Sequence, residues 1–564
     1  MKKCIKEYKR WLRNTDPGDD LFDGLLMMED KEDDIYEAFY KDLKFGTSGL
    51  RGVMMPGTNR MNVPVVRRAT QGLSDYMNIY YKNPSAVISY DSRNNSKKYA
   101  DAAAEVLAAN DIKTYVFNEI MPVSALSFAI RELSCDMGIM ITASHNPKEY
   151  NGYKVYDSEG CQIRSRVAEG IFEEIKKVDI FGDVRNGRGK GLIAAVPEKI
   201  SHDFVEEAYK VSPGEDRDLS DLKLVYTPLN GTGQKPITEL LSKAGLKNIH
   251  VVEEQKMPDG DFPTCPSPNP EYSEIYGLAE RLCDDTDSDL IIATDPDCDR
   301  LGIAVKKGNG YKNLSGNQIA VLLFDYICRA KEIPEQAVAV RSIVSTPQID
   351  KIAEENGIGI ETCLIGFKYI GEKIGRLRDR FIFGFEEGNG YLAGDFVRDK
   401  DGVSTALLAC RMAAYHKERG RTLLQALEEI SEEYGYYKEK VLSFTFDGSR
   451  GVKKMQKIMD SIRKHSHEDI FGKKATTIID YLTGEQYIIG DSSKCEMAAG
   501  TRPTGLPKEN ILEFVLNDES RIIIRPSGTE PKIKVYLFAC SRQKATAKTI
   551  INDNAEKVKA LWGK

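Results

Sequence analysis

The stretch Met137-Gly138-Ile139-Met140-Ile141-Thr142-Ala143-Ser144-His145-Asn146-Pro147 joins an apolar run to a polar turn. The run predicts a buried strand, and the turn after it presents one hydroxyl, that of Ser144, flanked by an imidazole and an amide. Because a serine hydroxyl is a weak nucleophile, it needs a general base or a prior modification. No Gly-x-Ser-x-Gly elbow surrounds Ser144, which disfavours acyl transfer. Taken alone, the stretch also fits an ordinary turn with a capping serine.

A second apolar run, Leu290 to Ala293, leads into the motif Asp295-Pro296-Asp297-Cys298-Asp299-Arg300. In an extended backbone alternate side chains point the same way, so we expect the three aspartates to converge on one face. Three like charges held together need a cation, and hard oxygen ligands suit Mg²⁺. An EF-hand is a poor match, because Arg300 stands where its glycine belongs. The alternative is a solvated acidic turn.

A third apolar run, Phe381 to Phe383, precedes Gly384-Phe385-Glu386-Glu387-Gly388-Asn389-Gly390-Tyr391. Paired acids before a glycine-rich loop suit vicinal sugar hydroxyls, since one carboxylate accepts two hydrogen bonds. The glycine spacing misses the dinucleotide fingerprint by one residue and gives no support for NAD.

A fourth motif, Arg525-Pro526-Ser527-Gly528-Thr529-Glu530-Pro531-Lys532-Ile533-Lys534, concentrates hydrogen-bond donors and positive charge. Arginine grips phosphate in a bidentate manner, and backbone N–H groups in a turn form a concave anion site. A tight turn between two strands explains the glycine and the prolines but not the number of donors. The motif therefore indicates a phosphate-binding loop.

Composition narrows the class of protein. A chain of 564 residues is long enough for three to four domains, and 41% hydrophobic with 29% charged residues is typical of globular proteins. The eleven cysteines form no C-x-x-C pair, which predicts neither a zinc site nor a disulfide framework. Free thiols, a charged N-terminal segment unlike a signal peptide and the lack of any apolar run near ~18 residues predict a cytoplasmic protein without a membrane partner.

The net charge of −7 disfavours nucleic acid as a partner. A phosphate-binding site must then be a local basic patch within an acidic protein. The cationic side chains in or near the motifs are Arg51, His145, Lys154, Arg300, Lys368, Lys400 and Arg525.

An α/β rhythm runs through most of the chain, and each key strand ends in one of the motifs. Such units predict parallel or mixed sheets covered by helices, with ligands at the carboxyl ends of the strands. We expect strands at 87–90, 114–117, 137–141, 222–226, 250–252, 337–343 and 381–385, and helices at 97–109, 123–133, 235–244, 318–330, 348–355 and 545–561.

The same rhythm predicts the division into domains. Residues 1–40 form a helical arm with Tyr8 and Trp11-Leu12 facing inward, for which the sequence indicates no function. Three α/β domains follow, and a C-terminal α+β domain completes the chain. The charged stretches 181–190 and 212–221 are expected to be surface loops or linkers. The predicted domain ranges are 41–210 with Ser144, 211–314 with the aspartates, 315–436 with the glycine-rich loop, and 437–564 with the phosphate loop.

Together the four motifs resemble those of the α-D-phosphohexomutase superfamily, which comprises the phosphoglucomutases and phosphomannomutases. Their order along the chain matches, and the resemblance runs from about residue 44 to the C-terminus. The length resembles that of the longer bacterial branch. Further matching stretches are Gly46-Thr47-Ser48-Gly49-Leu50-Arg51-Gly52, Tyr90-Asp91-Ser92-Arg93 and Pro266-Ser267-Pro268-Asn269-Pro270-Glu271.

The resemblance implies four domains around a central cleft and transfer of a phosphoryl group between C1 and C6 of a hexose phosphate. It implies a phosphoserine at Ser144, one Mg²⁺ per chain and a sugar 1,6-bisphosphate that serves as intermediate and activator. The implied catalytic residues are Ser144, His145, Lys154, Arg51 and Arg300; the metal ligands Ser144, Asp295, Asp297 and Asp299; the sugar-binding residues Glu386, Gly388, Asn389, Lys368 and Lys400; the phosphate-binding residues Arg525, Ser527, Gly528, Thr529 and Lys534.

Two departures from the family pattern leave the sugar open. Phosphoglucomutases usually carry Glu-x-Ser where this chain has Glu386, Glu387 and Gly388, and Thr-Gly-Phe-Lys where it has Ile365-Gly366-Phe367-Lys368. Each change removes a hydroxyl, so glucose, mannose and pentose phosphates remain candidates in that order. Two other classes also remain: a phosphatase that uses Asp295 as nucleophile and a non-catalytic sugar-phosphate-binding protein. The protein is expected to be a monomer or a homodimer.

Overall fold

The computed structural model describes residues 1–187, 191–330, 332–446, 448–464, 472–489, 500–527 and 532–562. By their internal contacts they form two compact units. One unit comprises Met1–Val340 and Gly366–Leu423, and the other comprises Arg341–Ile365 and Leu424–Lys564. Within the described residues, no helix has both the length and the apolar character needed to cross a membrane.

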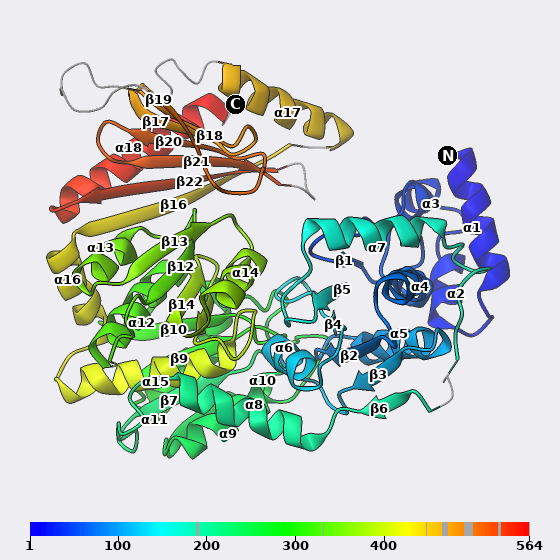
Figure 1. Cartoon of the computed structure of the whole chain (residues 1–564), viewed down its shortest axis with the longest axis horizontal. Coiled ribbons are helices and arrows are strands. Elements are labelled where there is room, and N and C mark those ends of the chain that lie inside the picture. Colours follow the sequence, from blue (N-terminus) through cyan, green and yellow to red (C-terminus); the bar gives the residue numbers. More distant parts are fainter. Residues whose placement is uncertain are drawn as a thin grey trace. The chain divides into compact units, whose positions relative to one another are not determined.

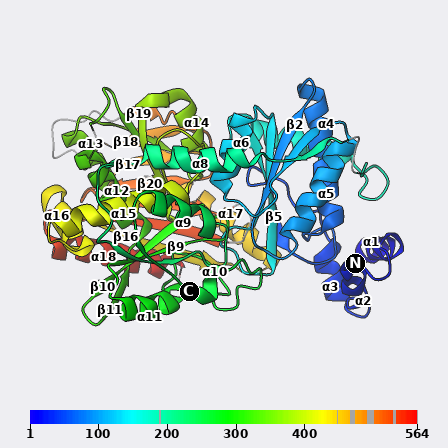
Figure 2. The same cartoon turned by 90° about the horizontal axis from the view of Figure 1, so that it is seen from below.

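Three helices form the N-terminal arm, α1 (Lys2–Asn14), α2 (Asp20–Leu26) and α3 (Glu32–Phe39), which lie together at one end of their unit (Figures 1 and 2). The predicted inward face is confirmed for Tyr8 and Trp11, which are buried, whereas Leu12 is half-buried. The Trp11 ring lies 5.6 Å from that of Phe39 and 5.5 Å from that of Phe181. The arm thus shares one hydrophobic core with the first sheet.

The first sheet has six strands in the order β1-β5-β4-β2-β3-β6. β2 pairs in parallel with β3 and β4, whereas β5 is antiparallel to β4 and to β1. β4 is buried on both faces, as its uninterrupted apolar run predicts. The strands are β1 (Leu50–Val53), β2 (Ser85–Tyr90), β3 (Lys113–Val116), β4 (Met137–Ile141), β5 (Tyr150–Asp157) and β6 (Ile193–Ala195). The helices of this region are α4 (Val63–Tyr80), α5 (Ser96–Ala109), α6 (Val123–Glu132), α7 (Ser165–Lys177) and α8 (Glu198–Val211).

The second sheet has five strands in the order β11-β10-β9-β7-β8 and is also mixed. Thr294 at the end of β9 pairs with Leu301 at the start of β10, so the aspartate motif is the loop between two antiparallel strands. The strands are β7 (Lys223–Thr227), β8 (Asn248–Val251), β9 (Leu290–Thr294), β10 (Leu301–Lys307) and β11 (Gly310–Asn313). The helices are α9 (Gln234–Lys243), α10 (Glu253–Lys256), η1 (Ser273–Tyr276) and α11 (Gly277–Thr286).

A third α/β region follows, in which β14 and β15 form a hairpin. Glu386 pairs with Gly390, so Glu387, Gly388 and Asn389 make the turn. The strands are β12 (Val338–Ser342), β13 (Gly359–Cys363), β14 (Phe381–Glu386) and β15 (Gly390–Ala393). The helices are α12 (Gly316–Ala330), α13 (Gln348–Glu355), α14 (Phe367–Leu377), η2 (Arg378–Arg380), α15 (Gly402–Glu418) and α16 (Leu423–Tyr434).

The C-terminal sheet has seven strands in the order β16-β22-β21-β20-β17-β18-β19, and every neighbouring pair is antiparallel. The predicted fold class, three α/β domains with mixed sheets and a C-terminal α+β domain, is confirmed, and the structure adds that the C-terminal sheet is antiparallel. The strands are β16 (Tyr436–Thr445), β17 (Ala475–Asp480), β18 (Glu485–Ile488), β19 (Gly500–Pro503), β20 (Leu512–Leu516), β21 (Arg521–Pro526) and β22 (Lys532–Ser541); the helices are α17 (Gly448–Lys464) and α18 (Lys544–Trp562).

The stretches expected to be loops or linkers carry no helix or strand over residues 181–187 and 212–221, and residues 188–190 lie outside the described chain. The first of these stretches is nevertheless more than a surface loop. Phe181 packs on Trp11, and Asp179 just before it accepts hydrogen bonds from Arg10, the longer being 2.6 Å. The bond to Arg10 lowers the pKa of Asp179 to about 2. This segment therefore fastens the arm to the first domain.

Candidate active site

Ser144 lies at the carboxyl end of β4, where the chain turns sharply. Its backbone is in the left-handed region, with φ of 53°, and its N–H donates to Thr142 Oγ1 at 2.7 Å. The side chain is almost fully buried, yet its hydroxyl donates to Asp295 Oδ2 at 2.7 Å and lies 3.1 Å from His145 Nδ1. The turn thus aims the hydroxyl at the aspartate loop, which is 151 residues away in sequence.

The aspartate loop brings Asp295, Asp297 and Asp299 together, but not through the extended backbone that the sequence suggested. That part of the prediction is wrong: residues 295–300 form a turn, in which Cys298 has φ of 53°. Asp295 Oδ1 accepts the N–H groups of Asp299 at 3.1 Å and of Arg300 at 3.0 Å. These two hydrogen bonds from Asp295 to the far end of the loop hold the turn closed. As a result the three carboxylates converge.

The three aspartates fit a metal ion. One oxygen from each lies within 4.8 Å of the others, and all three residues are buried. Asp297 Oδ1 and Asp299 Oδ1 have no hydrogen-bond partner among the described residues. Buried carboxylate oxygens left without a donor are costly unless a cation neutralises them, and an all-oxygen set suits Mg²⁺.

Cationic side chains from other elements surround the aspartates. Lys154 on β5 donates to Asp297 Oδ2 at 2.9 Å and lies 3.7 Å from Asp299 Oδ2. Lys400 Nζ lies 3.2 Å from the same oxygen of Asp299. Burial and the charges of Asp297 and Asp299 raise the pKa of Asp295 well above its usual range. Burial would also raise the pKa of Asp299, but Lys400, Lys154 and Arg300 lower it below its usual range.

Two further cations and an imidazole complete this cluster. Arg51, the second residue of β1, donates to Asn146 Oδ1 at 3.0 Å, and Arg300 donates to Glu271. Burial, together with the charges of Arg300 and Arg51, lowers the pKa of His145 well below its usual value. Gly49 makes the entry to β1 possible, since its φ is 69° and a Cβ there would lie 1.8 Å from the carbonyl oxygen of Tyr153.

The glycine-rich turn between β14 and β15 adjoins this cluster. A Cβ on Gly388 would lie 3.3 Å from Glu271 Oε1 and 3.6 Å from Arg300 Nη1. Asn389, with φ of 62°, donates to the carbonyl of Leu301 at 3.0 Å and so ties the turn to the start of β10.

Glu386 and Lys368, both predicted sugar ligands, are held by other loops. Glu386 accepts the N–H of Gly366 at 2.7 Å, and burial raises its pKa. Lys368 donates to Thr47 Oγ1 at 3.0 Å. Their contact with a sugar remains a prediction.

Arg93 organises the loop that carries Ser144, a role the sequence did not reveal. Its guanidinium donates to the carbonyls of Ser144 at 2.5 Å, Pro147 at 2.8 Å and Tyr150 at 3.0 Å, and also to that of Asn146. The fully buried carboxylate of Asp91 lies 3.4 Å from Arg93 Nε. The planar guanidinium of Arg93 thus holds the loop in place by binding four of its backbone carbonyls. The Asp-x-Arg spacing was visible, but only folding shows which carbonyls it serves.

Lys400 also has a support that sequence reasoning missed. Asp399 Oδ1 lies 3.1 Å from Lys400 Nζ, and Asp399 Oδ2 accepts the hydroxyl of Tyr156 at 3.0 Å. Tyr156 belongs to β5, two residues after Lys154. The first α/β domain therefore helps to place a lysine of the third one against Asp299.

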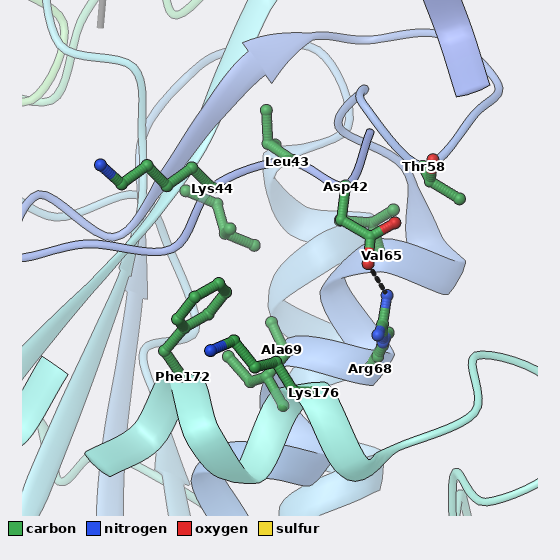
Figure 3. Close-up of a pocket in the computed structure, with 11 residues that line it drawn as sticks. Asp42, Leu43, Lys44, Thr58, Val65, Arg68, Ala69, Phe172 and Lys176 are labelled. Carbon is green, nitrogen blue, oxygen red and sulfur yellow. Dashed lines mark hydrogen bonds and ion pairs between the residues drawn. The ribbon is translucent and has the colours of Figure 1, made fainter. Parts of the chain in front are cut away.

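A cavity of about 410 Å³ lies on the other side of β1 and is not part of this cluster (Figure 3). Leu50 lines the cavity whereas Arg51 does not, as expected for neighbours on a strand. Of its three cations, Arg68 and Lys176 are paired with Asp42 at 2.8 Å and Glu173 at 2.6 Å, and Lys44 is the third. A mainly apolar lining in which two of three cations are already paired is a poor place for a sugar phosphate.

The predicted phosphate loop belongs to the other unit. Arg525 on β21 and Lys534 on β22 are register partners, and the N–H of Ser527 donates to the carbonyl of Lys532 at 2.7 Å. Residues directly opposite each other share one face of a sheet, where two like charges repel unless an anion lies between them. Gly528 and Thr529 lie outside the described residues.

A buried hydroxyl among three carboxylates and a ring of cations, on strand ends of α/β domains, is the arrangement of a phosphoryl-transfer enzyme. Comparison with known proteins agrees. Residues 42–180, 202–309 and 315–434 match the phosphoglucomutase/phosphomannomutase alpha/beta/alpha domains I, II and III, and residues 473–556 match the C-terminal domain of the same family. The chain belongs to the phosphoglucomutase/phosphomannomutase family and is an isomerase of the phosphosugar mutase type.

Individual relatives agree with this assignment. The chain is 36% identical to a phosphoglucomutase of Staphylococcus haemolyticus over 510 residues, which is 89% of this chain and 91% of the relative. It is 36% identical to a phosphoglucomutase of Staphylococcus aureus over 534 residues, 93% of each chain.

Solved structures share the fold. A phosphoglucomutase/phosphomannomutase family protein from Burkholderia thailandensis has a TM-score of 0.66 at 19% identity, covering 92% of this chain and 97% of the other. The phosphoprotein parafusin from Paramecium, in its open form, has a TM-score of 0.67 at 19% identity, covering 93% of this chain and 97% of the other.

Proposed function

We propose that this enzyme interconverts glucose 1-phosphate and glucose 6-phosphate through a phosphoserine at Ser144. The observation that carries the proposal is the hydrogen bond from the Ser144 hydroxyl to Asp295, within a cluster of carboxylates and cations. In the first half-reaction the bond between phosphorus and Ser144 Oγ breaks, and one forms to the free sugar hydroxyl. Lys154 would carry the proton from that hydroxyl to Ser144 Oγ.

The bisphosphate would then turn over and return its other phosphoryl group to Ser144. Arg525, Ser527, Gly528, Thr529 and Lys534 would hold the phosphate that is not reacting, and the pairing of Arg525 with Lys534 across two strands supports this. Because each phosphate must use that loop in turn, the sugar site must accept two orientations. Glu386, Gly388, Asn389, Lys368 and Lys400 are the proposed sugar ligands.

One Mg²⁺ per chain would be held by Asp295, Asp297, Asp299 and an oxygen on Ser144. When bound, the ion supplies positive charge that offsets the charge developing on the phosphoryl group. Arg51, Arg300 and His145 would contribute to the same neutralisation from the protein. Sugar 1,6-bisphosphate is the proposed activator, because it restores the phosphate on Ser144 when the intermediate is lost.

The proposal extends to the organisation of the protein. We propose an arm over residues 1–40 and domains at 41–210, 211–314, 315–436 and 437–564. We also propose a monomer or homodimer in the cytoplasm, with no nucleic-acid or membrane partner. The cytoplasmic location is supported by the ten described cysteines, all of which are free thiols, as in a reducing compartment.

A phosphatase with Asp295 as nucleophile is a weaker alternative. Both carboxylate oxygens of Asp295 already accept hydrogen bonds. Oδ1 accepts two backbone N–H groups and Oδ2 accepts the hydroxyl of Ser144. Mass spectrometry tests the choice: after incubation with glucose 1,6-bisphosphate, Ser144 should carry a phosphate. An unmodified Ser144 together with a phosphate on Asp295, or on no residue, would contradict the mutase mechanism.

The preferred sugar is tested by comparing glucose, mannose and ribose 1-phosphates in a coupled assay. We expect the double variant Gly388→Ser, Ile365→Thr to raise the kcat/KM ratio for glucose over ribose 1-phosphate about tenfold, the worth of one or two neutral hydrogen bonds. The backbone permits serine, because Gly388 is not in the left-handed region and the three atoms nearest to its Cβ would belong to the side chains of Glu271 and Arg300, of which Glu271 Oε1, at 3.3 Å, would have to shift slightly.

Gly388→Ala, Ile365→Val is the matched control, since it adds similar bulk without either hydroxyl and should leave the ratio unchanged. A ratio that falls in the hydroxyl-bearing variant while total activity is preserved would show that these positions do not recognise the hexose.

Arg93→Lys tests the loop that carries Ser144. Lysine keeps the charge beside Asp91 but loses the planar fork, so the carbonyls of the loop lose partners. We expect kcat to fall by about 10²-fold through misplacement of Ser144, with KM changed little, because Arg93 is not a proposed substrate ligand. Arg164→Lys, at an exposed arginine paired with Glu372, is the control and should behave as wild type. Wild-type kcat in Arg93→Lys would refute this positioning role.

A further inference from the structure

The N-terminal arm, which the proposed mechanism does not use, separates its charges along the sequence. α1 carries six lysines and arginines and one acid, whereas residues 16–37 carry ten acids and one lysine. The whole chain has a net charge of −7, so α1 is a basic helix on an acidic protein. Such segregation indicates electrostatic recognition of a partner rather than solubility alone.

The outer face of α1 is a basic stripe. Lys2, Lys6, Lys9 and Arg13 recur at the spacing of one helix face and are exposed, whereas the opposite face is buried. With the half-buried Ile5 and Leu12, these four side chains line a shallow groove of about 560 Å³. The stripe therefore combines positive charge with a concave aliphatic strip.

The outer face of α3 has the complementary character. Asp33, Tyr36, Glu37 and Tyr40 share one face and are exposed, and the two tyrosine rings stack with centroids 5.4 Å apart. Ile35, Ala38 and Phe39 on the other face are buried. We call this face the acidic-aromatic stripe.

The two stripes do not neutralise each other within one chain. α1 and α3 meet through their inner faces, where Tyr8 and Trp11 pack on Phe39. Across the arm, all of which the structure describes, no ion pair joins a cation of α1 to an acid of residues 16–37; Arg10 pairs with Glu7 and Asp179. Among the described residues only Asp19 of these acids has an ion pair, with Lys98 at 3.8 Å, so the remaining charges of both sets are left for something outside the chain.

For its length, the arm also exposes more large apolar side chains than the rest of the described chain. Of twelve large hydrophobic side chains exposed among the described residues, five belong to the first 40: Met1, Leu26, Met27, Tyr36 and Tyr40. Met27 is 72% exposed. Apolar side chains gathered on a small charged module mark a protein–protein contact.

We propose that the arm binds the arm of a second copy of this chain. The basic stripe of one copy would lie on the acidic-aromatic stripe of the other, with a lysine over the ring of Tyr36, since the ring of Tyr40 is already covered by Lys41 of its own chain at 4.9 Å. Each chain carries both stripes, so we place the two contacts reciprocally about a twofold axis, which gives a closed dimer and not an open filament. A nucleic acid or an anionic membrane would fit α1 alone and would be repelled by the ten acids beside it.

Sedimentation equilibrium of the full chain gives the first test. We expect a dimer at 50 mM salt whose dissociation constant rises at least tenfold at 500 mM, because exposed charges are screened. A monomer at both salt concentrations would overturn the proposal, as would a dimer indifferent to salt.

Charge reversal gives the decisive test. The variant Lys2→Glu, Lys6→Glu, Lys9→Glu should be monomeric alone. So should the variant that combines Asp33→Lys and Glu37→Lys of the acidic-aromatic stripe with Asp30→Lys, at an exposed acid just before α3. Mixed together they should form a heterodimer, and all six changes in one chain should restore the homodimer. A dimer that survives either reversal, or a mixture that stays monomeric, would refute the contact between stripes.

The control variant Lys199→Glu, Lys247→Glu, Lys307→Glu changes net charge equally at exposed lysines outside the arm and should dimerise as wild type. Mutase activity and thermal melting check that every variant is folded, since none of these residues belongs to the proposed active site. Loss of dimer in the control would assign the effect to net charge and overturn the proposal.

Discussion

Ser144→Ala is expected to lower mutase kcat by several orders of magnitude while the protein stays folded. The change removes the atom that would carry the phosphoryl group, and no second hydroxyl is proposed to replace it. The turn should survive, because its backbone bonds to Thr142 and Arg93 do not involve the Ser144 hydroxyl. A steady-state assay with glucose 1-phosphate and added glucose 1,6-bisphosphate measures the loss.

Two measurements separate loss of chemistry from loss of structure. Calorimetry should show that Ser144→Ala still binds glucose 6-phosphate, and mass spectrometry should show that it no longer takes up phosphate from the bisphosphate. Retention of more than about a tenth of wild-type kcat would place the phosphoryl carrier elsewhere.

Asp297→Asn is expected to raise the Mg²⁺ concentration for half-maximal activity by about tenfold or more. The amide has the same size but removes one of three anionic ligands, and it also weakens the ion pair with Lys154. Titration calorimetry with Mg²⁺ should show the same loss of affinity without reference to turnover. Asp284→Asn, at an exposed aspartate of the same domain, is the control and should leave Mg²⁺ affinity unchanged.

Chelation extends this test to the wild-type enzyme. Treatment with EDTA should abolish activity, and added Mg²⁺ should restore it. Activity indifferent to EDTA would show that the aspartate cluster is not a metal site, whatever its geometry.

Local patterns in the sequence were sufficient for the fold class and for the chemical character of each loop. The run from Met137 to Ile141 is wholly apolar, so it had to be a buried strand, and the polar residues after it had to lie at the strand's end. The same argument located the aspartate loop after β9 and the glycine-rich turn after β14. Such features depend on neighbours in sequence, which is why they can be read without a structure.

Contacts between distant segments depended on the packing of whole elements. The convergence of Asp295, Asp297 and Asp299 follows from a turn with Cys298 in the left-handed region, which no alternation of residues predicts. Similarly, the four carbonyls served by Arg93 could not be found from sequence.

The pairing of side chains from different α/β regions also depends on the packing of whole elements. Lys400 lies on Asp299, and Asp399 behind it accepts the hydroxyl of Tyr156, although these residues come from three different α/β regions. Side-chain chemistry limits which groups can pair, since a lysine needs an acid and a buried acid needs a donor. Which of the many acids each lysine meets is set by the burial of apolar strands and helices far from it, and that depends on the entire fold.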